Sequence, residues 1–145
     1  MNLIIGDKAP GFSLPESDGT VRNLTDYLGK WVILYFYPKD DTPGCTKEAC
    51  GFRDVVKDYA AKNAVVLGIS KDSVVSHQKF IQKYNLNFPL LSDDSKKVIQ
   101  MYGAAGALGT KRITYLLDPG GIIRKIYLQV DPVIHATEII KDIRI

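Results

Sequence analysis

Apolar residues along this chain fall into two kinds of pattern. Two runs are apolar throughout and rich in β-branched and aromatic side chains: residues 31–37 (WVILYFY) and residues 64–70 (AVVLGIS). Such runs are typical of strands covered on both faces, so we expect both strands at the centre of a sheet. Between them, from Thr42 to about Lys62, apolar side chains recur at helical spacing. They are Phe52, Val55, Val56, Tyr59 and Ala60.

The flanking segments continue this alternation of strands and helices. Near the start, apolar residues alternate with polar ones on either side of Asp18-Gly19, a turn sequence, so residues 11–14 and 20–24 are predicted to form a β-hairpin. The later segments predict further elements, which are a helix over 73–84, a short strand in NFPLLSD, a helix over 94–103, a hairpin of TYLLD and IIRKIYLQV, and a helix over 132–142. This order predicts an α/β fold, with a central mixed sheet flanked by helices and an N-terminal β-hairpin.

Composition narrows the class of protein. The chain has 145 residues, of which 46% are hydrophobic and 24% charged, so we expect a single folded domain over 1–145. A net charge of +3, spread along the chain, gives no reason to expect nucleic-acid binding. No run reaches the ~18 apolar residues of a membrane span, and the first residues do not resemble a signal peptide. We therefore expect a cytoplasmic protein without a membrane partner.

Both cysteines lie in one short stretch, DDTPGCTKEAC, residues 40–50. The stretch follows a predicted central strand, and ligands of open α/β sheets bind where such strands end. With Thr42 as N-cap, Pro43 takes the first helical position and Cys45 the third. Unpaired backbone N–H groups and the positive end of the helix dipole favour a thiolate there. Cys45 is therefore a candidate nucleophile.

Helical geometry separates the two sulfurs. Cys45 shares a helix face with Ala49 and Phe52, so it faces the sheet, whereas Cys50 lies about 200° from Phe52 and faces solvent. The two Cα atoms would be about 8.6 Å apart on an intact helix. A disulfide requires less than about 7 Å, so the first helical turns must unwind before the two sulfurs can join.

This arrangement favours one type of thiol chemistry. An activated cysteine reacts first, and a second thiol that reaches it only after local unfolding then resolves the product. The expected first product is a sulfenic acid, which would condense with Cys50, and the expected substrate is a peroxide.

The residues around Cys45 resemble a known family. Pro38, Thr42 and Cys45 fit the Pro-x-x-x-Thr-x-x-Cys signature of peroxiredoxins, and the wider segment YFYPKDDTPGCTKEAC is similar to the bacterioferritin-comigratory, or Q-type, subgroup. Similar segments extend over nearly the whole chain, and they include GDKAPGFSL, SKDSVVSHQKF, NFPLLSD and RITYLLD. The resemblance implies a thioredoxin-like fold.

The resemblance also implies roles for particular residues. Cys45 would be the peroxidatic and Cys50 the resolving cysteine, joined in an intramolecular disulfide during turnover. Thr42 would hydrogen-bond the thiolate and the peroxide, and Pro38 would shield the pocket. Arg112, two residues before the segment TYLLD, matches the arginine that holds the thiolate and polarises the peroxide.

Other polar residues nearby have simpler interpretations. We expect Glu48 to be a solvated carboxylate in the first turns of the helix, with a secondary role from its matching position in the family. Lys39, Asp40 and Asp41 are expected in a solvated loop. Both histidines, His77 and His135, are expected to pack in the interior, and their distance from each other and from the cysteines makes a zinc site improbable.

The sequence thus predicts a thioredoxin-dependent thiol peroxidase for hydrogen peroxide and small alkyl hydroperoxides. No metal, flavin or haem is expected, and the protein is expected to be a monomer, with a weak homodimer as the alternative. Two rival functions stay open: a thiol–disulfide oxidoreductase acting on proteins, which would usually carry Cys-x-x-C, and a redox-responsive binding or holdase protein.

Overall fold

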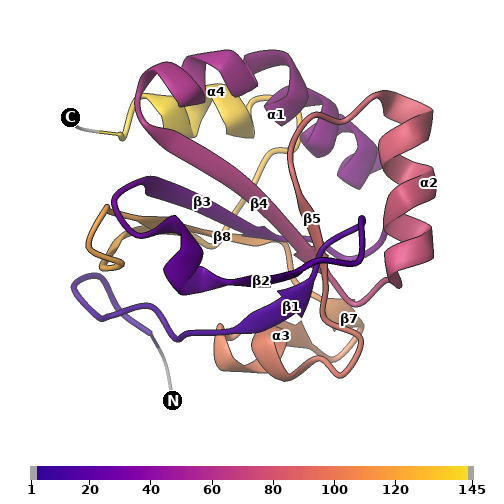
Figure 1. Cartoon of the computed structure of the whole chain (residues 1–145), viewed down its shortest axis with the longest axis horizontal. Helices are drawn as coiled ribbons and strands as arrows, with labels where there is room; N and C mark the ends of the chain where they lie inside the picture. Colours follow the sequence, from indigo (N-terminus) through magenta and orange to yellow (C-terminus); the bar gives the residue numbers. More distant parts are fainter. Residues whose placement is uncertain (1–2, 144–145) are drawn as a thin grey trace.

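A five-stranded mixed sheet forms the centre of the protein (Figure 1). The structure is a computed structural model that describes residues 3–143, so the ends of the predicted 1–145 domain lie outside the described residues. The strands of this sheet, in spatial order, are β5 (Leu90–Ser92), β4 (Ala64–Ser70), β3 (Trp31–Phe36), β8 (Ile113–Leu117) and β9 (Ile123–Tyr127). β3 pairs in parallel with β4 and antiparallel with β8, which confirms the predicted mixed sheet.

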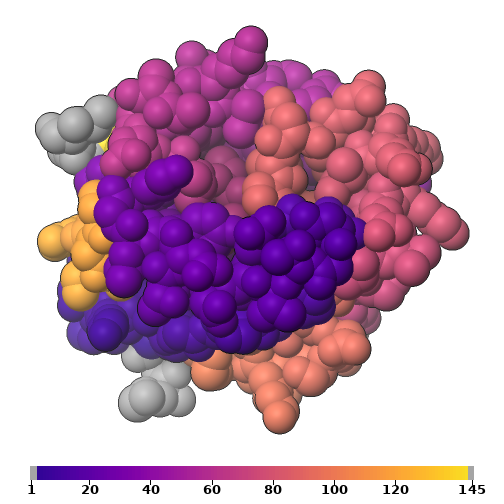
Figure 2. Space-filling model, viewed as in Figure 1, coloured from indigo at the N-terminus to yellow at the C-terminus, as the bar shows by residue number. Residues whose placement is uncertain are grey.

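The two faces of the sheet are covered by different elements. Because side chains alternate along a strand, Leu34 and Phe36 of β3 point to one face, and Ile33 and Tyr35 point to the other. Leu34 and Phe36 belong to a core shared with the N-terminal segment and α3 (Lys97–Met101), whereas Ile33 and Tyr35 pack with the remaining helices. Figure 2 shows the N-terminal segment spread over the side of the molecule that faces the viewer.

Three helices lie on the second face. They are α1 (Pro43–Ala61), α2 (Val74–Tyr84) and α4 (His135–Ile140), all of which contribute to one core with β3. The predicted ranges of α1 and α2 are confirmed. Ser73 caps α2 by accepting a hydrogen bond from the backbone N–H of Ser76.

The other two predicted helices are shorter than expected. α3 starts at Lys97 rather than at residue 94, because Lys96 takes a left-handed conformation with φ 64°. Gly103, also left-handed, follows its end. α4 starts at His135 rather than at residue 132, because the Asp131 carboxylate accepts the backbone N–H of Val133 and holds a turn there.

The smaller elements lie near the N-terminus and before β8. The predicted hairpin is confirmed as β1 (Ser13–Pro15) and β2 (Val21–Asn23), followed by a 3₁₀ turn over Leu24–Tyr27. A second ribbon, β6 (Ala105–Gly106) with β7 (Gly109–Thr110), was not predicted, since two-residue strands carry no periodic pattern. Among residues 3–143, no helix combines the length and apolar character needed to span a membrane.

Candidate active site

The candidate site lies where β3 ends and α1 begins. The antiparallel register places Ile113, the first residue of β8, opposite Phe36, the last residue of β3. Arg112 comes directly before β8, so it lies beside the loop that connects β3 to α1. Since Ile113 and Tyr115 point to the α3 face, alternation directs Arg112 to the opposite face, towards α1.

Cys45 is held at this junction. It is the third residue of α1, after the N-cap Thr42 and Pro43, and only 2% of its surface is exposed. Arg112 Nη2 lies 3.4 Å from Cys45 Sγ. The structure therefore confirms the predicted helix position of Cys45 and brings the predicted arginine into contact with its sulfur.

Glu48 is part of the same cluster, and its expected solvent exposure is wrong. It is 1% exposed, and its Oε1 lies 2.7 Å from Arg112 Nη1. Burial raises the pKa of Glu48 to about 7, although the Arg112 charge and hydrogen bond act in the opposite direction. Three residues after Cys45 on α1, Glu48 lies on nearly the same helix face, and this spacing could have indicated its place in the site.

Arg112 is a bridge between two acidic groups. Burial by itself would lower the pKa of Arg112, but the negative charges of Glu48 and Cys45 and their hydrogen bonds raise it. Its guanidinium uses one terminal nitrogen for each partner, a fork that lysine could not reproduce. The bridge leaves the cation fixed next to the sulfur.

Tyr35 is buried next to this cluster, in the core between the sheet and α1. Burial raises the pKa of Tyr35 well above its usual value, and the nearby charges of Glu48 and Cys45 raise it further. Within the part of the chain that the structure describes, the Tyr35 hydroxyl and Glu48 Oε2 are buried without a hydrogen-bond partner. The apolar run over residues 31–37 predicts that Tyr35 is buried in the core, and the structure confirms that placement.

Thr42 and Pro38 lie on the loop before Cys45. Thr42 is the N-cap by backbone conformation, but over residues 3–143 its side chain makes no capping hydrogen bond. Its hydroxyl instead donates to the Lys39 carbonyl oxygen at 2.9 Å. Its proton is therefore directed away from the Cys45 sulfur in this state. Pro38 is half-buried at the end of β3.

Cys50 lies two turns of helix away from the N-terminus of α1 and is half-buried, so it is less exposed than expected. Cys45 and Cys50 are both free thiols. Gly51, the next residue, faces α4, where an added Cβ would lie 3.7 Å from Ala136 Cβ. Because α1 spans Pro43–Ala61 without a break, both cysteines belong to one continuous helix, as the sequence predicted.

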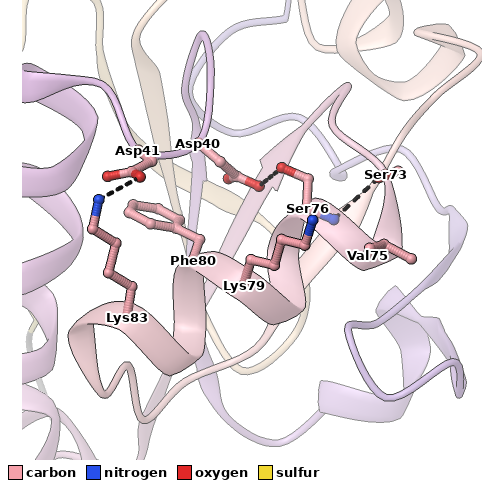
Figure 3. A pocket seen from close by; sticks show the side chains of 8 residues that line it. All are labelled: Asp40, Asp41, Ser73, Val75, Ser76, Lys79, Phe80 and Lys83. Atoms are coloured by element: carbon pink, nitrogen blue, oxygen red, sulfur yellow. Dashed lines mark hydrogen bonds and ion pairs between the residues drawn. The ribbon is translucent and has the colours of Figure 1, made fainter.

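The loop before Cys45 is anchored to α2, and the expectation of a solvated loop is wrong for Asp40. Asp40 is 7% exposed, and its carboxylate lies 2.7 Å from His77 Nδ1 and accepts hydrogen bonds from Tyr37 and Ser76. Asp41 is exposed and paired with Lys83 (Figure 3). His77 is buried as expected, but it is hydrogen-bonded rather than packed among apolar groups alone.

His135 is the first residue of α4 and is buried. Its Nε2 is 2.8 Å from the Thr114 hydroxyl, and its ring packs edge-on against Phe52 and Tyr127. Burial and the Arg112 charge lower the pKa of His135 to about 4. In residues 3–143, no three His, Cys, Asp or Glu side chains form a group that could hold a metal ion.

Comparison with known proteins agrees with the fold. The fold is the thioredoxin-like fold of the peroxiredoxins, and residues 5–126, which include both cysteines and Arg112, match the model of the AhpC/TSA family. The chain belongs to the AhpC/TSA family.

Its relatives are peroxiredoxins of the Bcp and Q type. The chain is 49% identical to a peroxiredoxin bcp of Coxiella burnetii, covering 97% of this chain and 98% of the relative. It is 41% identical to peroxiredoxin Bcp of Bacillus subtilis, covering 98% of both chains. Among solved structures, a cysteine-to-serine variant of Xylella fastidiosa PrxQ superposes with a TM-score of 0.93 at 34% identity, covering 98% of this chain and 96% of that one. These relatives support thiol peroxidase activity, in which a peroxide is reduced at the expense of a thiol reductant.

Proposed function

We propose that this protein reduces hydrogen peroxide and small alkyl hydroperoxides, with Cys45 as the nucleophile. The observation that carries the proposal is the 3.4 Å contact between Arg112 Nη2 and the buried sulfur of Cys45 at the start of α1. A fixed cation at that distance stabilises the thiolate and the negative charge that develops on the leaving oxygen. A relative from Xanthomonas campestris, with a TM-score of 0.88, is described by its alkyl peroxide reduction activity.

In the first step, the Cys45 thiolate attacks the terminal oxygen of the peroxide. The O–O bond breaks, an S–O bond forms, and the leaving alkoxide or hydroxide takes a proton to give an alcohol or water. Cys45 is oxidised to a sulfenic acid. Arg112 and the backbone N–H of Cys45 would donate to the reacting oxygens. The Thr42 hydroxyl oxygen would accept a hydrogen bond from the peroxide, since the hydroxyl already donates its own hydrogen bond to the Lys39 carbonyl oxygen. Pro38 would shield the pocket.

In the second step, Cys50 resolves the sulfenic acid. Its sulfur attacks the Cys45 sulfur, an S–S bond forms and the S–O bond breaks, and the leaving hydroxide takes the proton of the Cys50 thiol and departs as water. Because both residues belong to one helix, the first turns of α1 must unwind for the two sulfurs to meet. A dithiol reductant such as thioredoxin then reduces the Cys45–Cys50 disulfide by thiol–disulfide exchange and becomes oxidised itself.

We propose that residues 1–145 act as one domain, as a monomer or weak homodimer in the cytoplasm, without a metal or organic cofactor. Neither a nucleic acid nor a membrane is needed for the reaction. The substrate and the dithiol reductant are then the only partners that turnover requires.

A coupled assay of peroxide consumption with thioredoxin and its reductase tests the mechanism. Cys45→Ser should abolish turnover, and turnover that persists would refute the assignment. Cys50→Ser should still undergo a single oxidation at Cys45 but recycle slowly with thioredoxin. Unchanged steady-state recycling would remove Cys50 from the mechanism.

The same preparations separate the two rival functions. A protein thiol–disulfide oxidoreductase would reduce insulin disulfides faster than it consumes peroxide. A redox-responsive binding protein would be oxidised once per molecule and would show no turnover when reductant is supplied. We expect rapid peroxide turnover and little insulin reduction.

A further inference from the structure

The buried carboxylate of Asp40 connects the loop before Cys45 to α2. Its Oδ1 accepts the Tyr37 hydroxyl at 2.6 Å, and its Oδ2 accepts the Ser76 hydroxyl at 2.8 Å and contacts His77 Nδ1 at 2.7 Å. The Asp40 backbone N–H donates to Asp72 Oδ2 at 2.8 Å. Main chain and side chain of one loop residue are therefore both fixed, five positions before Cys45.

The partners of the two ring nitrogens of His77 show how His77 binds Asp40. His77 Nε2 lies 3.0 Å from the Leu91 carbonyl oxygen, which can only accept, so Nε2 carries a proton. At 2.7 Å, Nδ1 and Asp40 Oδ2 need a further proton between them, because two lone pairs would repel each other. With both side chains almost fully buried, this is a strong, charge-assisted contact.

Asp41 makes a second, weaker link between the same loop and α2. Its carboxylate contacts Lys83 Nζ and the Tyr84 hydroxyl, each at 2.8 Å, and its backbone is left-handed with φ 57°. Figure 3 shows Asp40 directed at Ser76 and Asp41 directed at Lys83. All four residues line a cavity of about 340 Å³. The ion pair of Asp41 is exposed to solvent, so it contributes little to stability.

We infer that Asp40 is a positioning residue, whose contact with His77 holds the loop of Pro38 and Thr42 in place and thereby keeps the first turn of α1 wound. This inference rests on the proposed function, since it concerns the unwinding of α1 that lets Cys45 and Cys50 join. When the contact is present, the wound state, in which Cys45 lies beside Arg112, is favoured. When it is lost, the first turn of α1 unwinds more readily, because the preceding loop no longer restrains the N-terminus of the helix.

The test compares two rate constants after one equivalent of hydrogen peroxide. Cys45 oxidation is measured in a Cys50→Ser background, and disulfide formation is measured with both cysteines present, by acid quench, thiol alkylation and mass spectrometry. Loss of a hydrogen bond to a charged group changes an equilibrium by about tenfold or more. In Asp40→Ala we therefore expect disulfide formation to become about tenfold faster, while Cys45 oxidation does not become faster.

Two further variants make the comparison specific. Asp40→Asn should keep disulfide formation within about threefold of wild type, because its amide can donate to His77 Nδ1 in place of the shared proton. Asp41→Asn is the matched control: it removes the same charge one residue away, tolerates the left-handed backbone and should also stay within about threefold. Circular dichroism checks that each variant is folded. If Asp40→Ala is not folded, Ser76→Ala replaces it and should shift disulfide formation in the same direction by a smaller factor.

The outcomes are distinct. The inference is overturned if folded Asp40→Ala forms the disulfide no faster than wild type, if both steps accelerate together, or if Asp41→Asn matches its effect. Failure of the proposed function would appear earlier, as wild-type protein that forms no Cys45–Cys50 disulfide at all.

Discussion

Arg112 Nη2 lies 3.4 Å from Cys45 Sγ, although the two residues are 67 positions apart in the sequence. The contact depends on the antiparallel pairing of β8 with β3, which brings the start of β8 to the point where α1 begins. The sheet register thus fixes where the cation lies relative to the sulfur. A one-residue slip in this pairing would direct Arg112 to the opposite face of the sheet.

Replacement of Arg112 by lysine should strongly slow Cys45 oxidation while keeping the positive charge. A lysine ammonium cannot contact Glu48 and Cys45 together as the two guanidinium nitrogens do. We expect the second-order rate constant with hydrogen peroxide to fall by about 10²–10³, the usual effect of losing one donor to a developing negative charge. Stopped-flow or quench measurement in a Cys50→Ser background gives this rate. Lys111→Gln, next to Arg112 but exposed, is the control, and an equal loss there would contradict the prediction.

Gly44 should not tolerate alanine, for a reason that concerns Arg112 rather than the helix. A Cβ at Gly44 would lie 3.0 Å from Arg112 Nη2, so the guanidinium would have to shift by a few tenths of an ångström from its place beside the sulfur. We expect Gly44→Ala to lower the rate of Cys45 oxidation by at least about tenfold, because a misplaced donor loses much of its effect.

Gly51→Ala is the matched control on the same helix. A Cβ there would lie 3.7 Å from Ala136 Cβ, an ordinary contact, and alanine is favoured over glycine within a helix. We expect an unchanged oxidation rate and a free energy of unfolding higher by about 0.5–1 kcal/mol, measured by urea denaturation. Similar losses of activity in both variants would show that helix packing, not the Arg112 position, is responsible.

The sequence predicted the elements with continuous periodic patterns well. Residues 31–37 and the helix from Thr42 show their burial in the pattern itself, and the N-cap assignment placed Cys45 correctly. Glu48 and Asp40 were misjudged because both are charged, and charged residues are seldom buried without a partner. Their partners, Arg112 and His77, lie 64 and 37 positions away, so local pattern could not reveal them.

Stability should depend only weakly on pH in the mildly acidic range, because two buried groups act in opposite directions. Burial raises the pKa of Glu48 from 4.5 to about 7, so ionisation of Glu48 costs stability as pH rises between these values. Burial and the Arg112 charge lower the pKa of His135 from 6.5 to about 4, so protonation costs stability as pH falls through that range. Each effect corresponds to about 3 kcal/mol.

Glu48→Gln separates these two effects. The variant keeps the His135 contribution, so its free energy of unfolding should rise by up to about 3 kcal/mol between pH 4 and 6.5, whereas that of wild type stays nearly constant. Urea denaturation at several pH values measures both curves. Parallel curves for wild type and Glu48→Gln would show that Glu48 does not titrate in this range.

Disulfide formation should respond to helix propensity at the start of α1 but not further along it. Lys47 lies between the two cysteines and Lys57 lies beyond them, and both are exposed residues of α1. Glycine in place of lysine costs somewhat less than about 1 kcal/mol of helix stability at either position. If only the first turns must unwind, Lys47→Gly should form the Cys45–Cys50 disulfide about threefold faster. Lys57→Gly should lower global stability by a similar amount and leave the disulfide rate unchanged. The rate is measured after one equivalent of hydrogen peroxide, by alkylation and mass spectrometry, with urea denaturation to confirm that the two variants lose equal stability. Equal acceleration in both variants would mean that the whole helix, rather than its first turns, opens before the cysteines join.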